Sequence, residues 1–304
     1  PKTLKVSIVA GIGLFLGIIG FKNAGIIVAN KATFVALGNL HRPETLLAIL
    51  GFFLMVGLDA MGMIGAIIIS ILSVSILGIL FGLTPFHGIF SMPPSLMPTL
   101  LQMNLKDAFS LGLFTIVFAF LFVDLFDNTG TLIGIAYRAG LMDKNGKLPR
   151  IGRVLIADST AAIVGATLGT STTTSYVEST IGVKVGGRTG LTAVVVAFFF
   201  LIALFFSPLA NSIPLYATAP ALIYVACLMT RAFIDVDWEE TTEYVPAIIT
   251  AITMPLTFSV AEGISFGFIS YTAIKILSGR YKDLNIAVVV LAIAFILKYA
   301  FLNH

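Results

Sequence analysis

The residues best suited to chemistry in this chain are carboxylates set among apolar residues. Asp124 and Asp127 lie near the end of an apolar run, FTIVFAFLFVDLFDNTGTLIGIA, and Thr131 follows four residues later. On a helix these three positions share one side. A carboxylate at the middle of a bilayer costs roughly 2.5–3.5 kcal/mol. We therefore expect Asp124 and Asp127 to face protein or a water-filled cavity, where they could bind a polar ligand or a proton. The alternative is a helix end at the membrane surface.

A polar run, GTSTTTSYVESTIG, holds a third carboxylate, Glu178. It opens with six consecutive hydroxyl-bearing residues: Thr170, Ser171, Thr172, Thr173, Thr174 and Ser175. Such residues favour an extended segment over a helix start. Tyr176 follows, and we predict a half-helix with Glu178 in its first turn. Broken helices in transporters build midplane sites in this way, because their free backbone N–H groups point at the ligand. A Ser/Thr-rich packing interface would explain the hydroxyls but not the glutamate.

The composition is that of an all-α polytopic membrane protein. Of its 304 residues, 58% are hydrophobic and 11% are charged, and the mean hydropathy is +1.04. Soluble domains carry roughly 25% charged residues. The net charge of +3 reports membrane topology rather than nucleic-acid binding. The single cysteine, Cys227, and three histidines in no ligand spacing argue against a disulfide, a metal site or a metalloenzyme.

About ten apolar segments are expected to be helical. They cover residues 5–21, 45–58, 61–82, 108–136, 154–168, 189–206, 214–229, 245–259, 262–278 and 285–301. The first contains four glycines that suit close helix packing in lipid, namely Gly11, Gly13, Gly17 and Gly20. Residues 22–43 form a mixed connection. Four prolines exclude one regular helix from residues 83–107.

Loop charge predicts the orientation in the membrane. The 137–153 connection has five Lys or Arg residues against one Asp, which places it in the cytoplasm. Alternation along the chain then places the connections 231–243 and 279–284 on the cytoplasmic side as well. Trp238 in the first of these suits the membrane interface. The sequence therefore predicts a multi-pass protein of the cell (inner) membrane.

Four runs together resemble the nucleobase:cation symporter-2 (xanthine/uracil permease) superfamily, and within it the AzgA-like adenine/guanine/hypoxanthine permeases. They are VDLFDNTGTLIG (123–134), GTSTTTSYVES (169–179), TAPALIYVACLM (218–229) and MPLTFSVAEGISFGFISY (254–271). The resemblance covers essentially the whole chain. It implies fourteen spans in two inverted repeats of seven, divided into a core and a gate domain, with a broken helix at the substrate site.

The resemblance also implies a domain organisation. Residues 1–107 would be mostly gate-type helices with the end of the first repeat. Residues 108–188 would be core-type helices with the substrate-site half-helix, and residues 189–304 gate-type and closing helices. The chain is similar to spans five to fourteen only, so the first four spans are expected to be absent from it.

Residue roles follow from the resemblance position by position. Asp127 matches the acidic base-binding position of span eight, with Asp124 as the alternative for that role. Glu178 matches the acidic position of span ten that hydrogen-bonds the base. Thr131 lies where some relatives have a proton-linked histidine. Proton coupling is therefore expected to rest on Asp127, Asp124 or Glu178.

The expected function is proton-coupled uptake of adenine, guanine or hypoxanthine. The residues expected to contact the base are Glu178, Asp127, Thr174, Ser175, Tyr176 and Thr131. The expected partners are the purine base, protons and the lipid bilayer, with no cofactor, metal or nucleic acid; homodimerisation stays open. One alternative is an anion transporter or channel of the same inverted-repeat architecture, which would favour a basic residue beside the half-helix. The other, a membrane enzyme, lacks a nucleophile–base pair.

Overall fold

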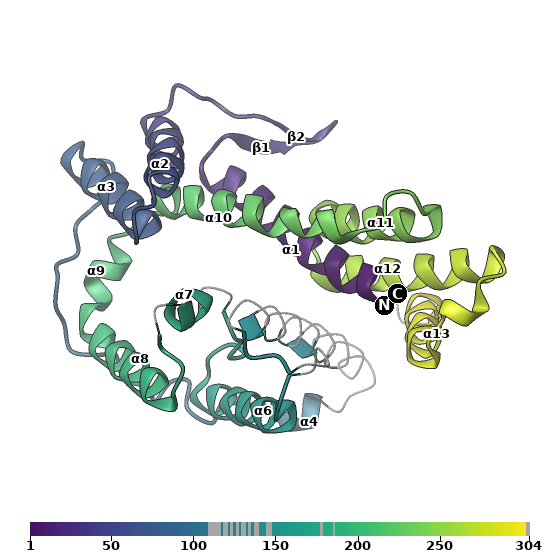
Figure 1. Cartoon of the computed structure of the whole chain (residues 1–304). Helices are drawn as coiled ribbons and strands as arrows, with labels where there is room; N and C mark the ends of the chain where they lie inside the picture. The colour runs from purple at the N-terminus through teal and green to yellow at the C-terminus, as the bar shows by residue number, and fades with distance from the viewer. Residues whose placement is uncertain are drawn as a thin grey trace. The chain divides into compact units, whose positions relative to one another are not determined.

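The computed structural model is built mainly of α-helices (Figure 1). It describes residues 1–108, 117, 121, 124–125, 128, 132, 135–136, 140–143, 148–176, 179–184 and 186–301. Within these residues, six helices are long and apolar enough to cross a membrane. They are Lys2–Asn23, Pro43–Ala60, Ile151–Leu168, Gly190–Asn211, Leu215–Asp235 and Val260–Leu277. Two shorter apolar helices, Ala66–Leu80 and Ile286–Ala300, accompany them.

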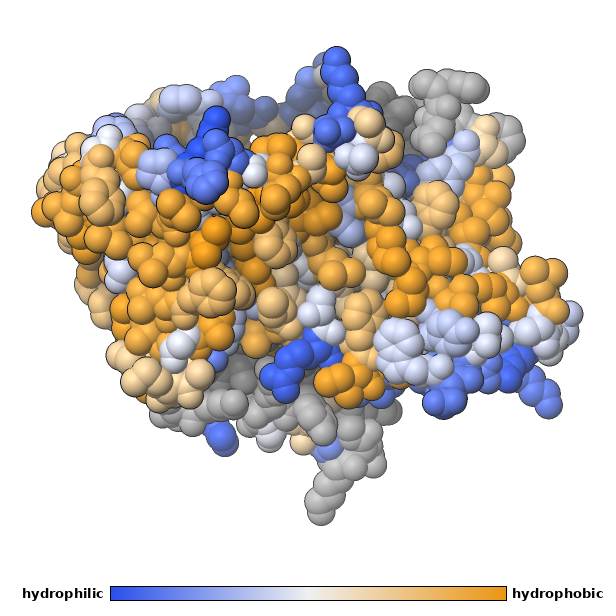
Figure 2. Space-filling view, turned by 90° about the horizontal axis from the view of Figure 1, so that it is seen from above, coloured by the Kyte–Doolittle hydropathy of each residue, from blue (hydrophilic) through white to orange (hydrophobic). Residues whose placement is uncertain are grey.

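Large hydrophobic side chains are exposed along these helices. In the helical stretch Gly190–Asn211, no residue of the apolar part that is long enough to cross a membrane is buried, and Phe200 is 72% exposed. Hydrophobic residues predominate on the face drawn in Figure 2, and hydrophilic ones form separate patches. Such a surface is unfavourable in water and favourable in hydrocarbon. The prediction of a polytopic helical membrane protein is therefore confirmed.

Contacts divide the chain into two compact units. Unit 1 comprises Pro1–Met92 and Leu204–Ile296, and unit 2 comprises Pro93–Ala203 and Leu297–His304. The elements of unit 1 are α1 (Lys2–Asn23), β1 (Ile27–Asn30), β2 (Phe34–Leu37), α2 (Pro43–Ala60), α3 (Ala66–Leu80), η1 (Leu204–Phe206), α9 (Ser207–Asn211), α10 (Leu215–Thr230), η2 (Arg231–Asp235), α11 (Thr241–Thr257), α12 (Val260–Leu277), η3 (Tyr281–Asp283) and most of α13 (Ile286–Phe301). Unit 2 holds α4 (Leu105–Ala108), α6 (Ile151–Leu168), α7 (Ser179–Lys184) and α8 (Gly190–Ala203). The gate-type and core-type ranges expected from the sequence stay a prediction.

Helix α1 is the central helix of unit 1 and packs against both α10 and α11 (Figure 1). Its glycines make this possible. A Cβ atom added at Gly13 would lie 2.7 Å from the Met229 Cβ, and one at Gly11 would lie 2.9 Å from the Ala251 Cα. Neither neighbour can move without moving its helix. The sequence prediction of close, glycine-mediated packing by this helix is confirmed.

The connection after α1 contains a β-hairpin, which is a small addition to the all-α prediction. Strands β1 and β2 pair antiparallel, from Ile27 opposite Leu37 to Asn30 opposite Phe34. The Asn30 Oδ1 atom accepts hydrogen bonds from the backbone N–H groups of Ala32 and Thr33, at 2.8 and 3.1 Å. This side-chain cap closes the three-residue loop.

The break between α11 and α12 lies two residues earlier than the gap, 260–261, between the two expected segments. It is confined to Phe258, which has a left-handed conformation with φ of 52°, and Ser259. The Ser259 hydroxyl accepts from the backbone N–H of Glu262 at 3.2 Å and caps α12. Glu262 thus lies in the first turn of α12.

Candidate substrate site

Unit 2 contains the polar run singled out in the sequence, and a glycine starts it. Helix α6 ends at Leu168, and Gly169 follows in a left-handed conformation with φ of 81°. The backbone N–H groups of Gly169 and Thr170 donate to the carbonyls of Ala166 and Gly165, which satisfies the last turn. Residues 170–176 then form no helix or strand, as the hydroxyl run predicted.

This segment, residues 170–176, turns back along α6. The Thr173 hydroxyl donates to the Ala161 carbonyl at 3.4 Å. A Cβ atom added at Gly165 would lie 3.2 Å from both Thr170 and Thr173 side-chain atoms. Because Ala161 and Gly165 are four residues apart, they present one face of α6 to the segment. The segment therefore rests on a helix surface that is open because Gly165 has no side chain.

The preceding helical stretch meets the segment from another side. The described residues between 117 and 136 are helical, among them Asp124 and Asn128, one turn apart. The Thr172 hydroxyl donates to the Asp124 carboxylate at 3.0 Å. The Ser175 backbone N–H donates to the Asn128 side-chain oxygen at 2.9 Å. Two contacts one turn apart thus connect this helix to the segment.

Helix α6 contributes a carboxylate to the same cluster. The Asn128 amide nitrogen donates to the Asp158 Oδ2 atom at 2.8 Å. Asn128 is 1% exposed, whereas Asp158 and Asp124 are half-buried. We call these residues, Asp124, Asn128, Asp158, Thr172 and Ser175, the polar cluster of unit 2. It joins three chain segments around two carboxylates, and it can offer acceptors and hydroxyl donors to a polar ligand.

The structure describes four of the seven residues that the sequence analysis proposed as binding or proton-coupling residues. Asp124 and Ser175 belong to the polar cluster. Thr174, the residue before Ser175, is half-buried, and Tyr176 is 71% exposed. The Tyr176 carbonyl accepts a hydrogen bond from the Ser179 N–H at the start of α7. The other three proposed residues, Asp127, Thr131 and Glu178, lie outside the described residues.

Sequence reasoning missed Asn128 and Asp158. Asp158 lies within the segment 154–168, which was expected to be apolar and helical, so the rule applied to Asp124 also covers it. Asn128 lies four residues after Asp124, which marks it as a residue of the same helix face. The burial of its amide could not be inferred from the sequence, because it depends on residues 170–176 packing against this helix.

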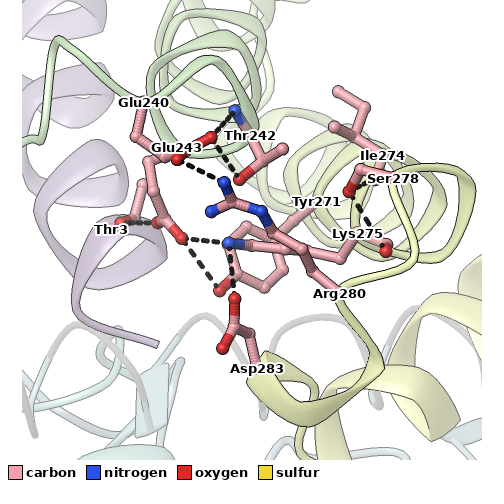
Figure 3. Close-up of polar contacts among 10 residues, drawn as sticks. All are labelled: Thr3, Glu240, Thr242, Glu243, Tyr271, Ile274, Lys275, Ser278, Arg280 and Asp283. Atoms are coloured by element: carbon pink, nitrogen blue, oxygen red, sulfur yellow. Dashed lines mark hydrogen bonds and ion pairs between the residues drawn. The ribbon is translucent and has the colours of Figure 1, made fainter.

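A second polar cluster lies in unit 1, at one end of α1, α11 and α12 (Figure 3). Lys275, which is 1% exposed, lies 2.5 Å from the Glu243 carboxylate and 3.2 Å from that of Asp283. The Thr3 hydroxyl of α1 donates to Glu243 as well, and so does the Tyr271 hydroxyl, at 3.5 Å. A buried ammonium is stable only with such partners. This cluster, the lysine cluster, binds three helices together.

An exposed ion pair extends the lysine cluster. Arg280 lies 2.7 Å from Glu240, so the connections before α11 and after α12 meet there. The backbone N–H of Thr242 and the Arg280 guanidinium hold the pKa of Glu240 below its ordinary value. The two connections that the sequence placed on one side of the membrane are thus in contact.

No metal centre is formed by the described residues. No group of three His, Cys, Asp or Glu side chains in that part of the chain is placed to hold an ion. His87, which lies among the prolines, is exposed, and its backbone N–H donates to the Ser212 hydroxyl at 3.0 Å.

Sequence comparison identifies the family. A sequence model of the Permease family, that of xanthine and uracil permeases, matches residues 1–266. The chain belongs to this nucleobase:cation symporter-2 family of permeases. As a permease with several apolar spanning helices, it is a multi-pass protein of the cell membrane. The family resemblance read from the four sequence runs is confirmed.

Three relatives illustrate the similarity of this permease. The adenine permease AdeP of Escherichia coli is 49% identical over 303 residues, which cover 100% of this chain and 68% of the relative. The guanine/hypoxanthine permease PbuG of Bacillus subtilis is 44% identical over 306 residues, covering 100% and 69%. The putative permease MJ0326 of Methanocaldococcus jannaschii is 51% identical over 304 residues, covering 100% and 70%.

Proposed function

We propose that this permease imports purine nucleobases together with protons, with adenine, guanine and hypoxanthine as the candidate substrates. The observation that carries the proposal is the polar cluster of unit 2, where two carboxylates meet a hydroxyl-rich segment within a membrane protein. Relatives named as adenine and guanine/hypoxanthine permeases support the choice of substrate.

A purine matches the chemistry of this segment. Its edge carries N–H donors next to lone-pair acceptors. A carboxylate accepts N–H groups, and hydroxyls or free backbone N–H groups donate to ring nitrogens or a carbonyl. We assign the principal contacts to Glu178 and Asp127, with Thr131, Thr174 and Ser175 around them. The exposed ring of Tyr176 is suited to stack on the base.

Proton coupling is assigned to the carboxylates Asp127, Asp124 and Glu178. A carboxylate that is removed from water binds a proton more readily. Asp124 accepts a hydrogen bond from Thr172. That hydroxyl can donate to the ionised form and accept from the protonated form, so the contact can persist in both states. A proton could therefore bind and leave without releasing the segment.

The proposed architecture follows the family resemblance. It has two inverted repeats of seven spans, with residues 108–188 core-type and residues 1–107 and 189–304 mostly gate-type. Residues 170–176 and α7 would form the broken helix at the substrate site. Alternating access would come from one domain rocking against the other, as in other transporters with repeats.

Uptake assays test the proposal directly. The protein is expressed in cells that lack their own purine permeases, and uptake of radiolabelled adenine, guanine, hypoxanthine and uracil is measured in competition. We expect a purine to be taken up and a protonophore to abolish its accumulation. Preferred uptake of uracil would reject the purine assignment, and accumulation that persists with the protonophore would reject proton coupling.

The variant Glu178→Gln tests the assigned base contact. Glutamine keeps the shape but loses one N–H acceptor and the charge, so we expect uptake to be abolished while the amount of protein in the membrane stays unchanged. The matched control is Glu239→Gln, which changes an exposed residue in the connection before α11 and should leave uptake intact. Normal uptake by Glu178→Gln would remove this residue from the site.

A further inference from the structure

The Asn128 side chain uses both ends of its amide, and its partners fix the orientation. A backbone N–H can only donate, so the amide oxygen faces Ser175, at 2.9 Å. A carboxylate accepts, so the amide nitrogen faces Asp158, at 2.8 Å. With 1% of its surface exposed, Asn128 is shielded from water that could replace these bonds. The residue therefore connects its own helix to α6 and to the segment 170–176.

The segment depends on such contacts for its position. Residues 170–176 form no helix or strand, so no regular backbone ladder holds them. Beyond the turn that closes α6, three hydrogen bonds attach these residues to the described helices: Thr173 to the Ala161 carbonyl, Thr172 to Asp124, and the Ser175 N–H to Asn128. The bond to Asn128 lies closest to α7. It is also the one made by a buried side chain.

We infer that Asn128 is a positioning residue of the nucleobase site. Its amide sets the place of the Ser175 backbone, and through it the places of Thr174 and Tyr176, which are proposed to contact the base. This inference rests on the proposed function for its substrate. The geometry on which it depends, a bridge between a carboxylate and a backbone N–H, is independent of which base is carried.

Three variants separate hydrogen bonding from charge. Asn128→Asp keeps the acceptor for Ser175 but places a second carboxylate against Asp158, so the bridge is lost. Asp158→Asn keeps an oxygen that can accept from Asn128, so the bridge persists without the charge. The swap Asn128→Asp with Asp158→Asn restores both bonds, since the new amide at position 158 donates to the new carboxylate at position 128. Asn30→Asp is the matched control, because the Asn30 oxygen only accepts in the hairpin loop.

The first measurement is the uptake of the purine that the wild-type protein transports. For Asn128→Asp we expect a loss of about tenfold or more, the scale for a lost hydrogen bond to a charged group. The loss should appear mainly as a raised KM, since the chief effect is on base contacts. The swap should recover uptake to the level of Asp158→Asn alone. Asn30→Asp should match the wild type.

The second measurement does not depend on transport. Thr174→Cys in a Cys227→Ser background provides a half-buried thiol on the segment, and its rate of reaction with a maleimide in membranes is recorded. We expect Asn128→Asp to raise this rate and the swap to return it to the starting value. If Asp158→Asn itself stops uptake, the two single variants and the swap are compared by their labelling rates alone.

The outcomes distinguish the inference from the proposed function. Unchanged uptake and labelling in Asn128→Asp would overturn the positioning role, and so would a swap that repairs neither measurement. A wild-type protein that carries no purine would refute the proposed function. In that case the labelling cycle still decides whether Asn128 positions the segment.

Discussion

At the scale of single residues, the two polar clusters differ in how charge is compensated. In unit 2, Asp158 is paired with the neutral amide of Asn128. In unit 1, the ammonium of Lys275 is paired with Glu243 and Asp283, whose side chains are 18% and 50% exposed. Complete ion pairing suits a structural connection, because the charges are already satisfied. The carboxylates of unit 2 keep capacity for a ligand or a proton.

Removing the charge of Glu243 should therefore destabilise unit 1. We expect Glu243→Gln to lower the free energy of unfolding in detergent by about 1.5–3 kcal/mol, the scale of a hydrogen bond to a charged group. Adding Lys275→Met to this variant removes the cation as well, so the double variant should lose less than the sum of the two single losses. Exposed Glu239→Gln serves as the control. Strictly additive losses would contradict the pairing.

At the scale of elements, the sequence predicted the helices well, because apolar runs and proline positions are local signals. It predicted the helix from 5 to 21 within a few residues of α1, and the loss of helix at the hydroxyl run after Leu168. It did not predict the β-hairpin, since β1 and β2 are four-residue, largely apolar strands that periodicity cannot distinguish from helix ends. The sequence also did not predict the hydrogen-bond partners of Asn128, because these partners lie on segments that are distant from it in sequence.

The packing of α1 yields a prediction at this scale. Gly13→Ala places a Cβ atom 2.7 Å from the Met229 Cβ, against the backbone of α10. We expect a loss of about 1–3 kcal/mol in the free energy of unfolding, as for overpacked cores. Gly57→Ala is the matched control, because nothing lies within 4 Å of its added Cβ atom in α2. Alanine there should be neutral or stabilising, since it favours a helix over glycine. Equal effects at both positions would contradict the close packing.

At the scale of the whole molecule, the contacts of unit 1 bear on orientation in the membrane. The Arg280–Glu240 pair joins two connections that the sequence placed in the cytoplasm. Lys2, at the start of α1, lies 3.5 Å from Asp235 in the same region. Because α1 is long enough to cross the membrane, the cytoplasmic placement of these connections predicts that the hairpin at the other end of α1 lies on the outer side.

Cysteine labelling checks this orientation. In a Cys227→Ser background, we expect Glu239→Cys and Lys282→Cys to react with an impermeant maleimide only when the cytoplasmic face is open to it. Thr33→Cys in the hairpin loop should react in intact cells. All three positions are exposed, so a lack of reaction reports the side and not burial. Reaction of Lys282→Cys and Thr33→Cys from one side would refute the assignment.

The buried ammonium of Lys275 also has a consequence for how the protein is made. During synthesis the carboxylate of Glu243 emerges before the cation it neutralises, because α11 precedes α12 in the chain. A lone α12 would lack the Glu243 partner of this cation, and a charge with fewer partners within a membrane segment is costly. The two helices should therefore leave the translocon as a pair. In a chain stalled on the ribosome after α11, Glu243 would still lack the Lys275 ammonium as its ion-pair partner.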